Sequence, residues 1–208
     1  MVSRCAATSV IAPSPGNNRA AARVSRSSAF IRSVAAHLRR GGLIAYPTES
    51  CYGIGCDPTN RQAVQRILKL KRRPQRKGLI LIAADYRQVA RYLQPLIPAE
   101  QVRLQHDGAQ AITCLMPVKP SCPRWLRGIH DTLAVRLTAH PFARDLCRRA
   151  GSALVSTSAN RSGQYPAKTF AVCRRLFGKK MWVLRGRVGK RKQPSTIRAW
   201  SDGRIVRN

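Results

Sequence analysis

Residues 43–57 read LIAYPTESCYGIGCD. The apolar run 43–46 is short and ends at Pro47, which predicts a buried strand. The hydroxyl groups and glycines that follow would lie at a strand end, where a ligand can approach the backbone closely. The stretch lacks both the G-K-[ST] ending of a phosphate loop and a complete G-x-G-x-x-G pattern. On its own it is therefore a weak indication of a ligand site.

Outward from this stretch, apolar periodicity predicts alternating helices and strands. Apolar residues recur at helical spacing in 29–40, 61–71, 86–93, 141–150 and 170–177. Short apolar runs typical of strands occupy 79–84, 111–118, 132–137, 153–156 and 181–184. This interleaving predicts an α/β fold with a mixed sheet.

The first 28 residues differ from the rest, because they are rich in Ala, Ser, Pro and Gly and carry four Arg without one acid. Such a composition is also found in transit peptides. We favour a disordered or mis-annotated N-terminal extension and expect one folded domain at 29–208. No apolar run reaches the ~18–20 residues of a membrane-spanning helix, so we expect no membrane contact.

The charge of the chain is unusual. Thirty-nine Lys and Arg face eight Asp and Glu, a formal net charge of +31. Such a field attracts polyanions, so nucleic acid and anionic nucleotides are the first partners to consider. Residues 179–192 alone hold seven Lys or Arg and no acid. The alternative is a basic, solvated surface without a specific ligand.

Seven cysteines and four histidines are scattered along the chain without a C-x-x-C pair or an i, i+4 histidine pair. A zinc ribbon or thioredoxin-type site is not expected. Several cysteines lie in apolar runs, where a free thiol packs as a small hydrophobe. We therefore predict no metal site and a reducing, cytoplasmic location.

Two further segments carry candidate chemistry. Six of the nine residues 69–77 are cationic, and they link a predicted helix end to a strand through Gly78. Arginine can fork onto phosphate oxygens while lysine acts as a point charge, so this link suits a triphosphate. Residues 156–163, STSANRSG, offer hydroxyl and amide groups for ribose, phosphate or a Mg²⁺-bound water. The alternatives are a solvated charge run and a turn that satisfies only its own backbone.

Taken together and in order, the stretches AYPTESCYGIGCDP, LKLKRRPQRKGLILIA, LAVRLTAHP and LVSTSANRSG resemble the YrdC/TsaC family, over residues 30–207. The family's K-x-R motif matches 71–73 and its S-x-N motif matches 158–160. The match is closer to the short, single-domain bacterial form. The resemblance implies an open, twisted, partly barrel-like α/β fold with flanking helices and a large basic cavity.

The resemblance also implies a reaction, in which L-threonine, bicarbonate and ATP give threonylcarbamoyl-adenylate and pyrophosphate for tRNA threonylcarbamoyladenosine. A separate tRNA threonylcarbamoyl transferase complex would use the product, and Mg²⁺ would accompany the nucleotide. By resemblance, the catalytic and ATP-phosphate residues are Lys71 and Arg73. The other nucleotide-binding residues implied are Ser158, Asn160 and Ser195. The threonine-binding residues implied are Thr48, Lys77, Thr113 and Arg136.

One stretch departs from the family pattern. The family carries W-P-G-P-x-T before its central strand, whereas residues 108–113 read GAQAIT and keep only Thr113. This change would loosen closure around the ligand, alter the substrate or lower activity. Two other functions stay open. One is a non-catalytic double-stranded RNA or tRNA-binding module, for which the net charge of +31 would suffice. The other is a repurposed carbamoyl-adenylate or nucleotide hydrolase, which the altered stretch keeps open.

Overall fold

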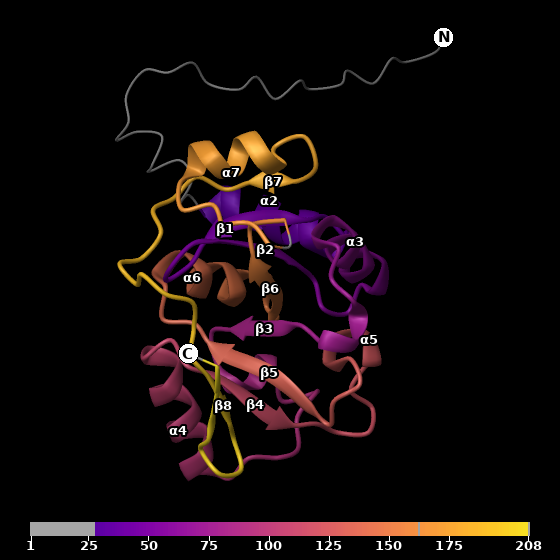
Figure 1. The fold of residues 1–208 in the computed structure, drawn as a ribbon, viewed down its shortest axis with the longest axis vertical. Helices are drawn as coiled ribbons and strands as arrows, with labels where there is room; N and C mark the ends of the chain where they lie inside the picture. The colour runs from indigo at the N-terminus through magenta and orange to yellow at the C-terminus, as the bar shows by residue number, and fades with distance from the viewer. Residues whose placement is uncertain (1–27, 162, 208) are drawn as a thin grey trace.

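The computed structural model describes residues 28–161 and 163–207 (Figure 1). The predicted N-terminal extension lies outside the described residues except for Ser28, with which the first described helix begins.

The described residues form one nine-stranded mixed sheet in the order β7-β1-β2-β6-β3-β5-β4-β8-β9. The strands are β1 (Ile44–Pro47), β2 (Tyr52–Cys56), β3 (Ile80–Ala83), β4 (Thr113–Pro117), β5 (Thr132–Leu137), β6 (Leu154–Ser158), β7 (Trp182–Val183), β8 (Ile197–Ala199) and β9 (Ile205–Arg207). Three neighbouring pairs are parallel, namely β1 with β7, β3 with β5 and β4 with β8, and the others are antiparallel. The predicted α/β class with a mixed sheet is confirmed.

Helices flank this sheet at both ends (Figure 1). They are α2 (Ser28–Arg39), α3 (Arg61–Lys71), α4 (Pro98–Ala109), α5 (Arg124–Arg127), α6 (Pro141–Ala150) and α7 (Phe170–Phe177), with 3₁₀ turns η1 (Gln75–Lys77) and η2 (Tyr86–Gln88). Two helices begin at local sequence signals. The Asn60 side chain caps α3 by accepting from the Ala63 amide, and Pro141 occupies the first turn of α6. Within the described residues, no helix is long and apolar enough to cross a membrane.

Four predicted elements, α3, β5, α6 and α7, have the bounds that the periodicity indicated. The predicted helix at 86–93 is wrong, because only 86–88 form a 3₁₀ turn. Beyond that turn the chain is drawn to the end of β4, where Leu93 bridges Val118 and the Tyr92 carbonyl accepts from Lys119. Residues 89–92 therefore form turns, in which the Tyr92 amide donates to the Val89 carbonyl, and the helix does not continue.

Strand alternation sends the apolar side chains of the sheet into two cores. Ile44 and Tyr46 of β1 pack with α2 and α6, whereas Ala45 between them joins the larger core on the other face. In β3, Ile82 likewise faces α2 and α6, while Leu81 faces the larger core. The larger core also receives the buried face of α3. Both faces of the central strands are thus covered by apolar side chains.

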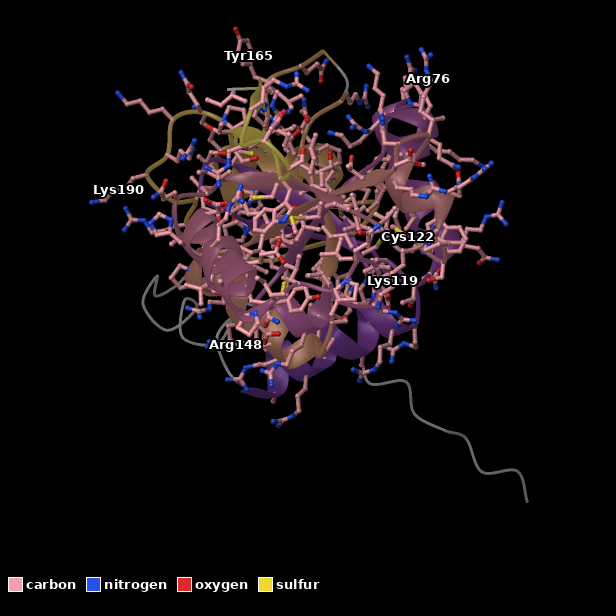
Figure 2. The ribbon with its side chains drawn as sticks, turned by 90° about the horizontal axis from the view of Figure 1, so that it is seen from below. Arg76, Lys119, Cys122, Arg148, Tyr165 and Lys190 are labelled. Carbon is pink, nitrogen blue, oxygen red and sulfur yellow. The ribbon has the colours of Figure 1, made fainter. Side chains whose placement is uncertain are left out.

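The core beneath α6 yields a stability prediction. Leu146 is fully buried there, so Leu146→Ala is expected to lower the free energy of unfolding by about 2–5 kcal/mol through lost burial and a residual cavity. Urea denaturation followed by circular dichroism measures this. Arg148 on the same helix is exposed and points to solvent (Figure 2), so Arg148→Ala should change stability by less than about 0.5 kcal/mol. Equal losses in the two variants would contradict the packing described.

Candidate active site

A pocket of about 520 Å³ opens over one face of the sheet. It continues the face that α2 and α6 cover, because residues two positions apart share a face. Ile82 and Leu154 lie in the core beneath these helices, whereas Ile80 and Ser156 line the pocket. Small residues such as Gly53 leave the sheet hollow at this point. The floor of the pocket is therefore the stretch of sheet that helices leave uncovered.

The pocket lining is cationic. Among the described residues, it contains no Asp or Glu and seven Lys or Arg: Arg73, Lys77, Arg127, Arg136, Lys168, Lys192 and Arg207. Burial, and then the neighbouring charge of Arg207, lower the pKa of Arg73. Burial, and then Arg136, lower the pKa of Arg207 in the same way. Like charges held this close favour an anionic ligand.

Lys71 lies behind the S-x-N turn and is 5% exposed. Its ammonium donates to the carbonyl of Ser158 at 2.5 Å and to the side-chain oxygen of Asn160 at 2.7 Å. Ser158 also donates to this Asn160 oxygen, at 2.7 Å. Burial, and then the charge of Arg73, lower the pKa of Lys71 to about 8. Lys71 thus fixes the two polar residues of the turn while keeping a titratable charge next to the pocket.

Arg73 is carried to the pocket wall by the end of α3. Arg72 adopts a left-handed conformation, φ +50°, which ends the helix and turns the chain. The Arg73 guanidinium then donates through Nε and Nη2 to the Gly78 carbonyl at 3.1 and 2.9 Å. The third guanidinium nitrogen, Nη1, does not donate to the Gly78 carbonyl. Lys77 lines the pocket beside it.

The P-T-E segment lies at the end of β1 and forms the tight connection of the β1–β2 hairpin. Thr48 donates to the Cys51 carbonyl from its side chain at 2.8 Å and from its amide at 3.0 Å. Burial raises the pKa of the Cys51 thiol, so this pocket-lining cysteine is protonated at neutral pH and is no thiolate nucleophile.

Arg136 of β5 lines the pocket and is 8% exposed. Its Nη2 lies 3.2 Å from a Glu49 carboxylate oxygen, and Thr138 donates to the other oxygen at 2.6 Å. Burial favours protonated Glu49, but the Arg136 charge and the Thr138 hydrogen bond outweigh it and lower the pKa of Glu49. The buried Nε of Arg136 has no hydrogen-bond partner among the described residues. It is a donor that a ligand carboxylate would satisfy.

The structure brings most predicted site residues to this one pocket. Those that line it are Thr48, Arg73, Lys77, Arg136, Ser158, Asn160 and Ser195. Lys71 and Thr113 stand just behind, since Thr113 is fully buried and donates to the Ser195 hydroxyl at 2.8 Å. Which of these residues bind ATP and which bind threonine stays a prediction.

Sequence reasoning missed several residues of the site. Lys168, Lys192 and Arg207 line the pocket, and Glu49 pairs with Arg136. Glu49 carried a usable signal, because it is an acid inside a polar strand-end segment of a chain with only eight acids. Arg207 carried none, since its place depends on β9 pairing with β8.

Within residues 28–161 and 163–207, no group of three or more His, Cys, Asp or Glu is arranged to hold a metal ion. Oxygen donors at the pocket are the hydroxyl and amide groups of residues such as Ser158 and Asn160.

Comparisons with known proteins agree with this arrangement. The Sua5_yciO_yrdC family model, described as Telomere recombination, matches residues 36–208. Threonylcarbamoyl-AMP synthase of Methylobacillus flagellatus is 52% identical over 176 residues, which span 85% of this chain and 98% of that protein.

Two solved structures share the fold. Sua5 of P. abyssi, complexed with L-threonine, matches with a TM-score of 0.78 and 27% identity over 86% of this chain and 53% of Sua5. The chain therefore spans about half of Sua5. E. coli YciO matches with a TM-score of 0.74 and 23% identity, over 88% of this chain and 90% of YciO.

The Lys71 environment predicts a pH dependence of anion binding. Sulfate keeps its charge between pH 7 and 9, whereas Lys71 is cationic below its pKa of about 8 and neutral above it. Sulfate affinity, measured by calorimetry, is therefore expected to fall about three- to tenfold as pH rises from 7 to 9. Lys71→Arg should flatten this fall, because a guanidinium stays charged. The same fall in Lys71→Arg would assign the titration to another group.

Proposed function

The chain belongs to the Sua5/YciO/YrdC family, and we propose that it makes threonylcarbamoyl-AMP and pyrophosphate from L-threonine, bicarbonate and ATP. The observation that carries the proposal is that one pocket is lined by seven of the nine predicted nucleotide and threonine residues, with Lys71 and Thr113 behind it, and that its described lining contains no Asp or Glu. The relative in Methylobacillus flagellatus, 52% identical over nearly its whole length, supports this activity.

The chemistry needs little from the protein beyond placement and charge. The threonine amine and CO₂ released from bicarbonate form a carbamate. A carbamate oxygen attacks the α-phosphorus of ATP, and the bond to the bridging oxygen breaks as pyrophosphate leaves. The carbamate is itself the nucleophile, so no covalent enzyme intermediate is required. Orientation of the two reactants and stabilisation of the phosphate charge are the catalytic contributions.

At the phosphate end, Lys71 and Arg73 hold the triphosphate, and Ser158, Asn160 and Ser195 bind the nucleotide. Nε and Nη2 of Arg73 donate to the Gly78 carbonyl, and Nη1 is the nitrogen that donates to a phosphate oxygen in this proposal. Lys71 keeps the S-x-N turn in place through the carbonyl of Ser158 and the side chain of Asn160. Its charge also offsets the negative charge that accumulates as pyrophosphate departs.

At the threonine end, Arg136 pairs with the amino-acid carboxylate, and Thr48, Lys77 and Thr113 complete the site. Arg136 offers its unpartnered Nε, while Glu49 holds the guanidinium by its Nη2 edge. Thr113 acts from behind through the Ser195 hydroxyl. The likeness to P. abyssi Sua5, which was solved with L-threonine, supports a threonine site in this fold.

Mg²⁺ enters with ATP, and its role is to neutralise phosphate charge. The lining contains hydroxyl and amide oxygens but no carboxylate, so these residues fit a hydrated ion brought by the nucleotide better than a resident one. In this proposal the pocket is the large basic cavity of a partly barrel-like, open sheet.

The product would pass to a cytoplasmic tRNA threonylcarbamoyl transferase complex. Direct contact with tRNA or double-stranded RNA is part of the proposal, because exposed cations such as Arg76 extend from the body (Figure 2). Affinity for RNA should fall with salt by about 0.9 log unit per contacted phosphate per log unit of salt.

The decisive experiment follows pyrophosphate release by the full chain while each substrate is omitted in turn. Release that needs ATP, threonine and bicarbonate together, with threonylcarbamoyl-AMP identified by mass spectrometry, supports the proposal. ATP cleavage without threonine would favour the repurposed hydrolase. RNA binding without any turnover would favour the non-catalytic module.

The two ends of the pocket predict opposite selectivity in two matched variants. Arg136→Lys should raise the KM for threonine about tenfold or more and the KM for ATP less than about threefold, because lysine cannot form the bidentate fork. Arg73→Lys should do the reverse. Steady-state kinetics with each substrate varied at saturating levels of the others separates the effects. Equal changes of both KM values in both variants would refute this division of the pocket.

A further inference from the structure

The segment between β7 and β8, residues 185–195, forms part of the pocket wall, and we name it the strap. Figure 1 shows it in orange to yellow, passing from β7 at one end of the sheet toward β8 at the other. Three strap residues line the pocket: Lys192, Pro194 and Ser195. The position of the strap therefore decides the shape of one pocket wall.

The first half of the strap is bound to the P-T-E segment by its backbone. The Gly189 amide donates to the Thr48 carbonyl at 2.9 Å, and the Arg191 amide donates to the Glu49 carbonyl at 3.1 Å. The crossing is close, since a Cβ at Gly189 would lie 2.6 Å from the Glu49 carbonyl oxygen. This half is fastened by main-chain contacts, which the lack of a side chain at Gly189 permits.

In the second half, Thr113 donates to the Ser195 hydroxyl at 2.8 Å and Arg207 donates to the Ser195 carbonyl at 3.1 Å. The residues before Ser195 are held by the side chain of Arg191. The Arg191 guanidinium donates through Nη1 to the Gln110 carbonyl at 2.9 Å. Its Nη2 reaches the Thr196 hydroxyl, and its Nε reaches the Pro194 carbonyl, both at 3.3 Å. Three nitrogens of one fork thus join the strap, the start of β8 and the turn after α4. Lysine has a single nitrogen and cannot make these three contacts together.

The turn that Arg191 grips is the stretch that departs from the family pattern. Residues 110–112 lack the expected Gly-Pro, and Ala111 adopts a left-handed conformation, φ +56°. This conformation is higher in free energy for a residue with a side chain, and it persists only where neighbouring contacts stabilise it. Gln110 directly precedes Ala111, so the Arg191 bond to its carbonyl acts at the strained position.

From these contacts we propose that Arg191 is a positioning residue, which ties the strap to the 110–112 turn and so holds Lys192, and together with Thr113 and Arg207 also Ser195, in their ligand-binding arrangement. Arg191 does not line the pocket and acts through the strap. The proposal rests on the proposed function for the identity of the ligands. It also explains how the altered turn remains compatible with a closed pocket wall.

The test compares three variants of the full chain. Arg191→Met removes both the positive charge and the three guanidinium donors, whereas Arg191→Lys keeps the charge and removes the guanidinium geometry. Lys190→Met removes a neighbouring exposed charge of the strap (Figure 2). The readouts are KM and kcat for threonylcarbamoyl-AMP formation, ATP affinity by calorimetry, hydrogen exchange of the 186–195 amides, and the melting temperature.

Arg191→Met and Arg191→Lys are both expected to raise the KM for ATP and threonine about tenfold, as the loss of charge-assisted hydrogen bonds implies, with kcat changed less than about threefold. Strap amides should exchange faster in both, while Lys190→Met stays within about twofold of the wild type. A merely structural role would lower the melting temperature without this KM-selective pattern.

Wild-type behaviour of Arg191→Lys would overturn the proposal, because charge alone would then suffice. Unchanged strap exchange and unchanged KM in Arg191→Met would overturn it as well. If Arg191→Met does not fold, Thr196→Val removes one contact of the three and should raise both KM values about two- to threefold. If the wild type makes no product, the proposed function fails, yet ATP affinity and strap exchange still decide the role of Arg191.

Discussion

Mutual repulsion among the pocket cations is the constraint on which the architecture depends. Burial, and then the charge of Arg207, lower the pKa of Arg73, and burial, and then the charge of Arg136, lower the pKa of Arg207. Among the described residues, the lining holds no Asp or Glu to relieve these charges. Glu49, buried beside Arg136, is the nearest compensation. The two apolar cores and the continuous sheet must therefore hold these charges in place, and an anionic ligand releases part of that opposing free energy.

The sheet meets this demand by using its two faces differently. One face of the central strands packs against the larger core along its length, while the other is covered by α2 and α6 only in part. The uncovered part becomes the pocket floor, where Ser156 and Gly53 occupy positions that larger side chains would fill. The pocket residues thus lie where the packed helices end, on strands that the two apolar cores hold rigid elsewhere.

Apolar periodicity predicted the helices and strands whose pattern is complete within the element. It did not predict those that form only because distant strands pair with them. Strand β5 and helix α6 were predictable because period-2 and period-3.6 patterns are complete within each. Strand β2 was missed, since Gly53 and Gly55 have low strand propensity and are extended only because β1 and β6 pair on both sides. Helix α4 was missed because Leu104 is its single buried large apolar residue. In the site, motif residues were found, whereas Arg207 depended on a pairing that no local pattern encodes.

The strand order has a consequence for the folding of the chain. Strand β1, near the start of the domain, pairs with β7, and β4 pairs with β8, so contacts of long sequence separation close both ends of the sheet. Such contacts form late, because the entropy of closing long loops must be overcome first. The pocket draws on residues from Thr48 to Arg207, so a growing chain on the ribosome has no complete ligand site until its final strands emerge. Nucleotide binding is therefore a readout of completed folding, and it cannot guide the earlier steps.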